Sequence, residues 1–94
     1  MATYQVTYWQ EIPSQVDARD EGGKAHKEML SKRFQELIDI IAVRRKLDSS
    51  DDYINQWNKG EKTVRDGPAS NVAKAIAAEL ESQYDAIRAN ALNR

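Results

Sequence analysis

The sequence predicts a single α+β domain: a small antiparallel sheet of three to four strands, with two main helices packed on one face and a short connecting helix. Three observations predict it. Thr3–Gln10 alternates with the period of two that is typical of a strand. Lys32–Leu47 and Ala69–Ala91 instead repeat with the period of a helix. The chain has 94 residues, which suffice for one domain (1–94) and are too few for two.

The first strand is expected to be central in the sheet. Tyr4, Val6 and Tyr8 fall on one side of Thr3–Gln10, whereas Trp9 falls on the other, more polar side. Both sides therefore carry bulky residues. This pattern favours a central strand over an edge strand.

Two further extended segments are expected after it. Ser14–Asp20 places Val16 on one face, and Lys24–Met29 can return beside it as a third strand. Gly22 and Gly23 between these segments can adopt the positive φ angles of a tight hairpin turn. Glu61–Arg65 is a candidate for a short fourth extended piece.

The helix expected over Lys32–Leu47 begins after Ser31, which can cap it. Its buried stripe is predicted from apolar residues at helical spacing, with three more that widen it: Phe34, Leu37, Ile38 and Ile41, then Ile40, Val43 and Leu47. A short helix should follow, because Ser49 and Asp52 have the spacing of a capping box. It would present Tyr53, Ile54 and Trp57 before Gly60 ends it.

The last helix is expected as one continuous element over Ala69–Ala91, after the break at Asp66-Gly67-Pro68. Alanines beside its apolar stripe allow close packing. The predicted core comprises Tyr4, Val6, Tyr8, Val16, Phe34, Leu37, Ile38, Ile41, Val72, Ile76 and Leu80.

Composition narrows the class of partner and the compartment. The formal net charge is −1, from 14 basic and 15 acidic residues, so the basic excess that phosphate backbones require is missing and nucleic acid is an unlikely partner. The chain has no cysteine, which favours a reducing interior. No signal peptide and no apolar run long enough for a membrane span are visible. We therefore expect a cytoplasmic protein without a membrane partner.

An ordered set of aromatic, proline and Arg-Phe-Gln positions carries a family resemblance. The set comprises Tyr8-Trp9, Ile12-Pro13, Gln15-Val16, Arg33-Phe34-Gln35, Ile38-Asp39, and Tyr53 with Trp57. In these residues the chain resembles the small bacterial virulence factor domain family, whose module also occurs in conserved virulence factor C-type proteins. The resemblance covers about residues 4–58, and more loosely the alanine-rich last helix. It implies a cytoplasmic bacterial protein and supplies no catalytic residues.

No catalytic, metal or cofactor site is predicted. His26 is the single histidine and has no orienting partner nearby in the sequence. Asp48, Asp51 and Asp52 lack the spacing of a calcium loop and are interpreted as helix-capping residues. We therefore expect a binding module rather than an enzyme.

The leading hypothesis is a non-catalytic binding or accessory module that acts through a protein partner. Trp9, Tyr53 and Trp57 can build a partner surface, although they can equally supply core area. Arg33 is a further candidate, either as an anchor for its helix or as part of a site.

Two alternatives are kept. A small anionic ligand or nucleotide could bind the helix start at Gly67–Asn71, where Ser70 lies among free backbone donors. Nucleic acid could bind if folding gathered one set of basic residues on a single face: Lys24, Lys27, Lys32, Arg33, Arg44, Arg45 and Lys46.

Overall fold

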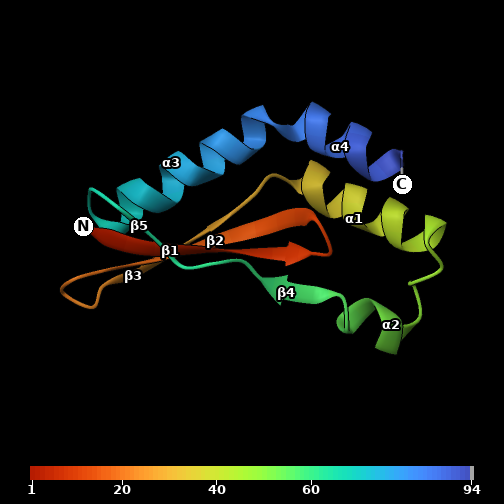
Figure 1. Ribbon diagram of the computed structural model, residues 1–94, viewed down its shortest axis with the longest axis horizontal. Helices are drawn as coiled ribbons and strands as arrows, with labels where there is room; N and C mark the ends of the chain where they lie inside the picture. The colour runs from red at the N-terminus through yellow and green to blue at the C-terminus, as the bar shows by residue number, and fades with distance from the viewer. Residues whose placement is uncertain (94) are drawn as a thin grey trace.

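The structure is a computed structural model, and it describes residues 1–93. Within that range the chain forms five strands and four helices (Figure 1). In chain order these are β1 (Ala2–Trp9), β2 (Ile12–Asp20), β3 (Ala25–Met29), α1 (Lys32–Arg44), α2 (Ser50–Ile54), β4 (Trp57–Lys59), β5 (Thr63–Arg65), α3 (Ala69–Ser82) and α4 (Tyr84–Leu92). The predicted α+β class is confirmed.

The sheet is antiparallel, with the strand order β3-β2-β1-β4 and with β5 also paired to β1. β4 pairs with residues 7–9 of β1 and β5 with residues 2–4, so the two short strands share one edge of β1. β1 is therefore central, as the sequence predicted. Gly23 has a φ of +85° in the turn between β2 and β3, where its N–H donates to the Asp20 carbonyl.

An irregularity in the β1–β2 pairing determines where Trp9 lies. The register shifts between Thr7 and Tyr8, and Ser14 of β2 has no partner in it. As a result Val6 and Trp9 are both buried although they are three residues apart. The prediction that Trp9 lies on a polar side was wrong, because strict alternation holds only as far as the irregularity.

The helices α1 and α3 pack against one face of the sheet, and α4 lies over α1 (Figure 1). The single last helix of the prediction is two helices in the structure. At Gln83 the backbone has φ −95° and ψ 2°, and its N–H donates to the Leu80 carbonyl three residues back. The Ser82 hydroxyl also donates to the Glu79 carbonyl, a local bond that competes with helix continuation. The break lets α4 pack against α1.

The short helix α2 ends earlier than predicted. Its capping box is present, since the Ser49 hydroxyl accepts from the Asp52 N–H and donates to the Asp52 carboxylate. Trp57 is in β4 instead of the helix, because it pairs with Trp9 in the sheet. Sheet pairing thus overrides the helical spacing of Tyr53 and Trp57.

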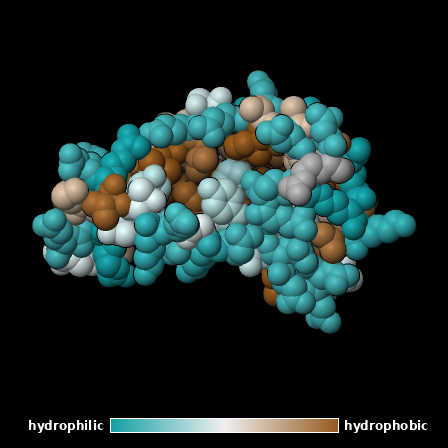
Figure 2. Space-filling view, in the orientation of Figure 1, coloured by the Kyte–Doolittle hydropathy of each residue, from teal (hydrophilic) through white to brown (hydrophobic). Residues whose placement is uncertain are grey.

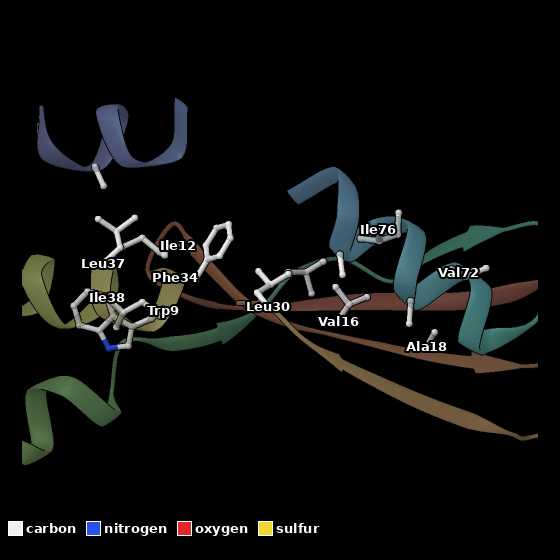
Figure 3. Packing of buried hydrophobic residues seen from close by; sticks show 14 of the residues in the cluster. Trp9, Ile12, Val16, Ala18, Leu30, Phe34, Leu37, Ile38, Val72 and Ile76 are labelled. Atoms are coloured by element: carbon white, nitrogen blue, oxygen red, sulfur yellow. The ribbon is translucent and has the colours of Figure 1, made fainter. Parts of the chain in front are cut away.

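The core lies between the sheet and the helices (Figure 3). Trp9 and Ile12, which the sequence-based core did not include, are both fully buried. Three residues of the predicted core are only partly buried, namely Tyr4, Tyr8 and Leu80. Ile40 and Val43 are 52% and 62% exposed, so the buried stripe of α1 is narrower than predicted. No helix within residues 1–93 is long and apolar enough to span a membrane.

Candidate functional site

Folding brings the three predicted aromatic candidates together in one stack. The Tyr53 ring lies between Trp9 and Trp57, with ring centroids 5.5 Å and 6.0 Å away. The Trp9 indole N–H donates to the Tyr53 carbonyl at 2.9 Å. Trp9 is 0% exposed, whereas Tyr53 and Trp57 are partly exposed. Contact with a partner at this stack is therefore limited to Tyr53 and Trp57.

The stack positions α2, which is too short to be stable alone. Besides its contacts with Trp9, Tyr53 is held by α1, because the Gln35 side-chain amide donates to the Tyr53 hydroxyl at 3.0 Å. The same amide donates to the Asp39 carboxylate at 3.0 Å. The aromatic residues thus fix α2 beside α1.

A groove of about 430 Å³ lies between these two helices. We call it the α1–α2 groove; it is lined by Asp39, Ala42, Val43, Asp48, Ser50, Tyr53 and Ile54. Val43 and Ile54 are 62% and 63% exposed, so the groove has two apolar side chains that are open to solvent. Figure 2 shows hydrophobic side chains among hydrophilic ones at the end of the molecule that carries α1 and α2.

The charge of the groove is negative. Its lining contains the carboxylates of Asp39 and Asp48, and no Lys, Arg or His of residues 1–93 lines it. Asp51 and Asp52 lie in the first turn of α2, where the helix dipole stabilises them. The groove therefore offers apolar contact and acceptors for a cationic ligand group.

The arginines near this end are engaged elsewhere. Arg45 binds Glu11 through both guanidinium nitrogens, at 2.7 Å and 2.6 Å, and also contacts the Gln10 side chain and the Ala91 carbonyl. The hydrogen bond to Glu11 raises the pKa of Arg45 against the opposing effect of burial. The bonds from Arg45 to Glu11 tie the end of α1 to the β1–β2 turn. The bond from Arg45 to the Ala91 carbonyl ties it to α4.

Arg33, a predicted site residue, joins the start of α1 to the end of α3. Its guanidinium lies 3.1 Å from the Glu81 carboxylate and 4.2 Å from the centre of the Tyr84 ring. Ser31 donates to the same carboxylate from its N–H and its hydroxyl. Partial burial acts to raise the pKa of Glu81, but the hydrogen bonds from Ser31 and Arg33 together lower it. The geometry is that of a helix anchor.

The helix start at Gly67–Asn71 gives little support to an anion site. Ser70 is half-buried in the first turn of α3 and makes no hydrogen bond through its side chain in the described part of the chain. A hollow of about 500 Å³ adjoins Gly67 and Pro68, and its lining also includes Met1, Asp20, Glu21 and Lys24. The N-terminal ammonium group of Met1 lies 3.7 Å from the Glu21 carboxylate, so charges of both signs surround the hollow and leave no positive excess for an anion. This alternative stays a prediction.

The titratable residues suggest no catalytic centre. The His26 Nε2 atom lies 3.1 Å from the Glu28 carboxylate. Among residues 1–93 no three His, Asp or Glu side chains are grouped so that they could hold a metal ion. Partial burial, together with the charge of Tyr4, raises the pKa of Tyr8, which makes that phenol a weaker acid and keeps it protonated.

Sequence reasoning missed the apolar side chains that line the groove. Val43 was assigned to the core and Ile54 to a longer helix. A signal for Val43 was present, because it lies about 140° around α1 from Ile38, away from the buried stripe. Asp39, which the family resemblance had singled out, also lines the groove.

One comparison with known proteins gives a match. A family model described as virulence factor matches residues 7–92, which is nearly the whole chain. No curated protein matches the chain, and no solved structure does.

Proposed function

We propose that this chain, which belongs to the virulence factor family, is a non-catalytic binding module of the bacterial cytoplasm. Its partner would be a protein that inserts an amphipathic, basic segment into the α1–α2 groove. The observation that carries this proposal is the exposure of Val43 and Ile54 on facing sides of a negatively charged groove. The absence of cysteine supports the reducing compartment.

The size of the groove determines how much of the partner it can hold. A volume of about 430 Å³ accommodates one or two apolar side chains and not a whole helix. Protein interfaces concentrate their binding free energy in such small pockets, which anchor a few residues of the partner. The remaining contact area would come from the neighbouring exposed surface of α1, where Ile40 is 52% exposed.

The charges determine the chemistry of the flanking residues. Asp39 and Asp48 can each accept hydrogen bonds from a Lys or Arg beside the apolar anchor. Asp39 keeps free acceptor capacity, since Gln35 occupies one of its two carboxylate oxygens. We therefore expect a segment in which Leu, Ile or Phe is flanked by Lys or Arg, and expect acidic segments to be rejected.

Fluorescence anisotropy with labelled helical peptides can test this proposal. Three peptides would share the same apolar positions and differ only in their flanking residues, which are Lys, Gln or Glu. The native protein should bind the Lys peptide at least about tenfold more tightly than the Glu peptide. The double variant Val43→Asp/Ile54→Asp should weaken binding of the Lys peptide by about tenfold or more, because it places charge in the apolar part of the groove.

Met29→Asp/Val64→Asp is the matched control, since Met29 on β3 and Val64 on β5 are similarly exposed apolar residues and the change in charge is the same. It should leave binding of the Lys peptide unchanged. Equal loss in the control and in the groove double variant, or equal affinity for the three peptides, would contradict the proposal. The surface substitutions should leave the fold intact, which circular dichroism can verify.

A further inference from the structure

The helix-free face of the sheet carries a second hollow, of about 790 Å³, which we call the sheet trough. It is lined by Thr3, Tyr4, Gln5, Gln15, Asp17, Ala18, Arg19, Ala25, His26, Lys27, Lys59 and Lys62. Thr3 pairs with Arg19, Gln5 with Asp17, and Asp17 with Lys27. Residues that pair directly share a face, and this face is opposite the one that buries Val6 and Val16.

Positive charge predominates in the trough. Its lining includes Arg19, Lys27, Lys59 and Lys62, and no ion pair within residues 1–93 engages any of them. The single Asp or Glu among its lining residues in the described chain is Asp17, which accepts a hydrogen bond from Gln15. A chain with a net charge of −1 therefore carries a locally cationic hollow.

The cations lie at opposite sides of the trough, which favours an extended anion. Lys27 belongs to β3, whereas Lys59 is in β4 and Lys62 is in the link to β5. Three strand spacings separate these sides, which is about 14 Å. An extended anion can contact the cations of both sides at once.

The glutamines between the cations can hydrogen-bond a polypeptide. The Gln5 amide group donates to the Gly60 carbonyl at 2.8 Å, and the Gln15 amide group donates to Asp17 at 3.2 Å. Their side-chain carbonyl oxygens accept no hydrogen bond from residues 1–93, so each can accept one from a ligand. The backbone N–H groups of a polypeptide are donors that suit these oxygens.

Aromatic content points the same way. Sheet faces that bind single-stranded nucleic acid stack bases on aromatic rings, and stacking contributes about 1–3 kcal/mol per base. Among the described lining residues the trough has two rings on which a base could stack, Tyr4 and His26, and the His26 ring contacts the Glu28 carboxylate. We propose that the sheet trough binds an extended, acidic segment of a protein, through cations at both sides and glutamine carbonyls between them. This site is separate from the α1–α2 groove.

The probe is a fluorescein-labelled peptide of about ten residues in which Glu and Ser alternate, so that in an extended conformation all the Glu side chains lie on one face, which can be turned toward the trough. A Gln–Ser peptide of equal length is the neutral control, and an oligo-dT of equal charge is the nucleic-acid probe. Anisotropy would be measured at about 50 mM salt, where screening is weak. The native protein should bind the Glu–Ser peptide and should bind the other two at least about tenfold more weakly.

Two double variants with the same change in charge locate the binding. Lys59→Glu/Lys62→Glu should weaken binding of the Glu–Ser peptide by about tenfold or more, because repulsion replaces attraction. Lys32→Glu/Lys74→Glu places the same charges on α1 and α3 and should change affinity by less than about twofold. Asp17→Asn should strengthen binding, since it removes the carboxylate from the trough.

Three results would overturn the proposal. One is equal weakening in the two double variants, which would show that only net charge acts. Another is tighter binding of oligo-dT than of the peptide, which would assign the trough to nucleic acid. The third is no binding of the Glu–Ser peptide at low salt by native protein that is shown to be folded. None of these results bears on the α1–α2 groove, so the two proposals stand or fall separately.

Discussion

The α1–α2 groove and the sheet trough are opposite in chemistry. The groove exposes Val43 and Ile54 beside two aspartates, whereas the trough exposes glutamines beside four cations. Their construction also differs. The groove depends on the aromatic cluster of Trp9, Tyr53 and Trp57, which holds α2 beside α1, whereas the trough depends on the pairing of β1 with β2 and β4 and of β2 with β3. The contrast teaches that a nearly neutral chain can carry two strong local fields of opposite sign, which total charge conceals.

Trp9→Ala has the largest expected effect and tests the dependence of the groove on the core. It should lower the free energy of unfolding by about 3–5 kcal/mol, because a fully buried indole leaves a cavity. Gln5→Ala in the trough should lower it by about 1 kcal/mol or less. Urea denaturation followed by circular dichroism gives both values. Similar losses for the two variants would contradict the claimed difference in construction.

Arg45→Ala should have the next largest effect. It removes the partly buried guanidinium that binds Glu11, whose side chain is 27% exposed. The loss should lower the free energy of unfolding by about 1.5–3 kcal/mol. The neighbouring Arg44→Ala is the control and should change stability by about 0.5 kcal/mol or less. If both variants behave alike, the Arg45 junction does not hold the end of α1 beside the groove.

Salt should separate the two sites. Raising salt from about 50 to about 300 mM should weaken binding of the Glu–Ser peptide to the trough by about tenfold, since charge dominates there. Binding of the Lys peptide to the groove should weaken by less than about threefold, because burial of apolar area is not screened. The reverse order of salt sensitivity would refute the assignment of charge to the trough and apolar contact to the groove.

The smallest expected effect is the pH dependence at Glu81, which is in neither surface. The pKa of Glu81 is lowered in the folded protein. Its carboxylate therefore adds stability above the unfolded-state pKa, and this contribution is lost as the pH falls through the folded-state pKa. Glu81→Gln should lower Tm at pH 7 by less than about 5 °C, and the difference should vanish in acid. A difference that persists in acid would show that the carboxylate charge is not responsible.

The sequence predicted the elements better than the faces on which their residues lie. The periods of two and of 3.6 residues predicted β1, α1 and the start of α3, and the Gly22-Gly23 turn predicted the β2–β3 hairpin. The register shift at Thr7 could not be predicted, because it depends on the pairing with β2. That shift buried Trp9. The break at Gln83 was not predicted either: the Ser82 hydroxyl donates to the Glu79 carbonyl at the break, and α4 then packs on α1.

The site could be predicted only in part. Tyr53 and Trp57 were selected as aromatic candidates, and both lie in the stack beside the groove. The trough could not be found, because Arg19, Lys27 and Lys59 belong to different strands. The basic set proposed from the sequence included Lys27, which lines the trough, but Arg33 and Arg45 of that set are engaged by Glu81 and Glu11. Local charge runs did not identify the charged surface.

The most direct test of the two-surface account is one amide chemical-shift experiment on labelled protein. The Lys peptide and the Glu–Ser peptide would be added separately and then together. The account predicts shifts around Val43 and Ile54 for the first peptide, shifts on β1, β2 and β3 for the second, and the sum of both sets when they are mixed. Shifts in a single shared region, or competition between the two peptides, would contradict it.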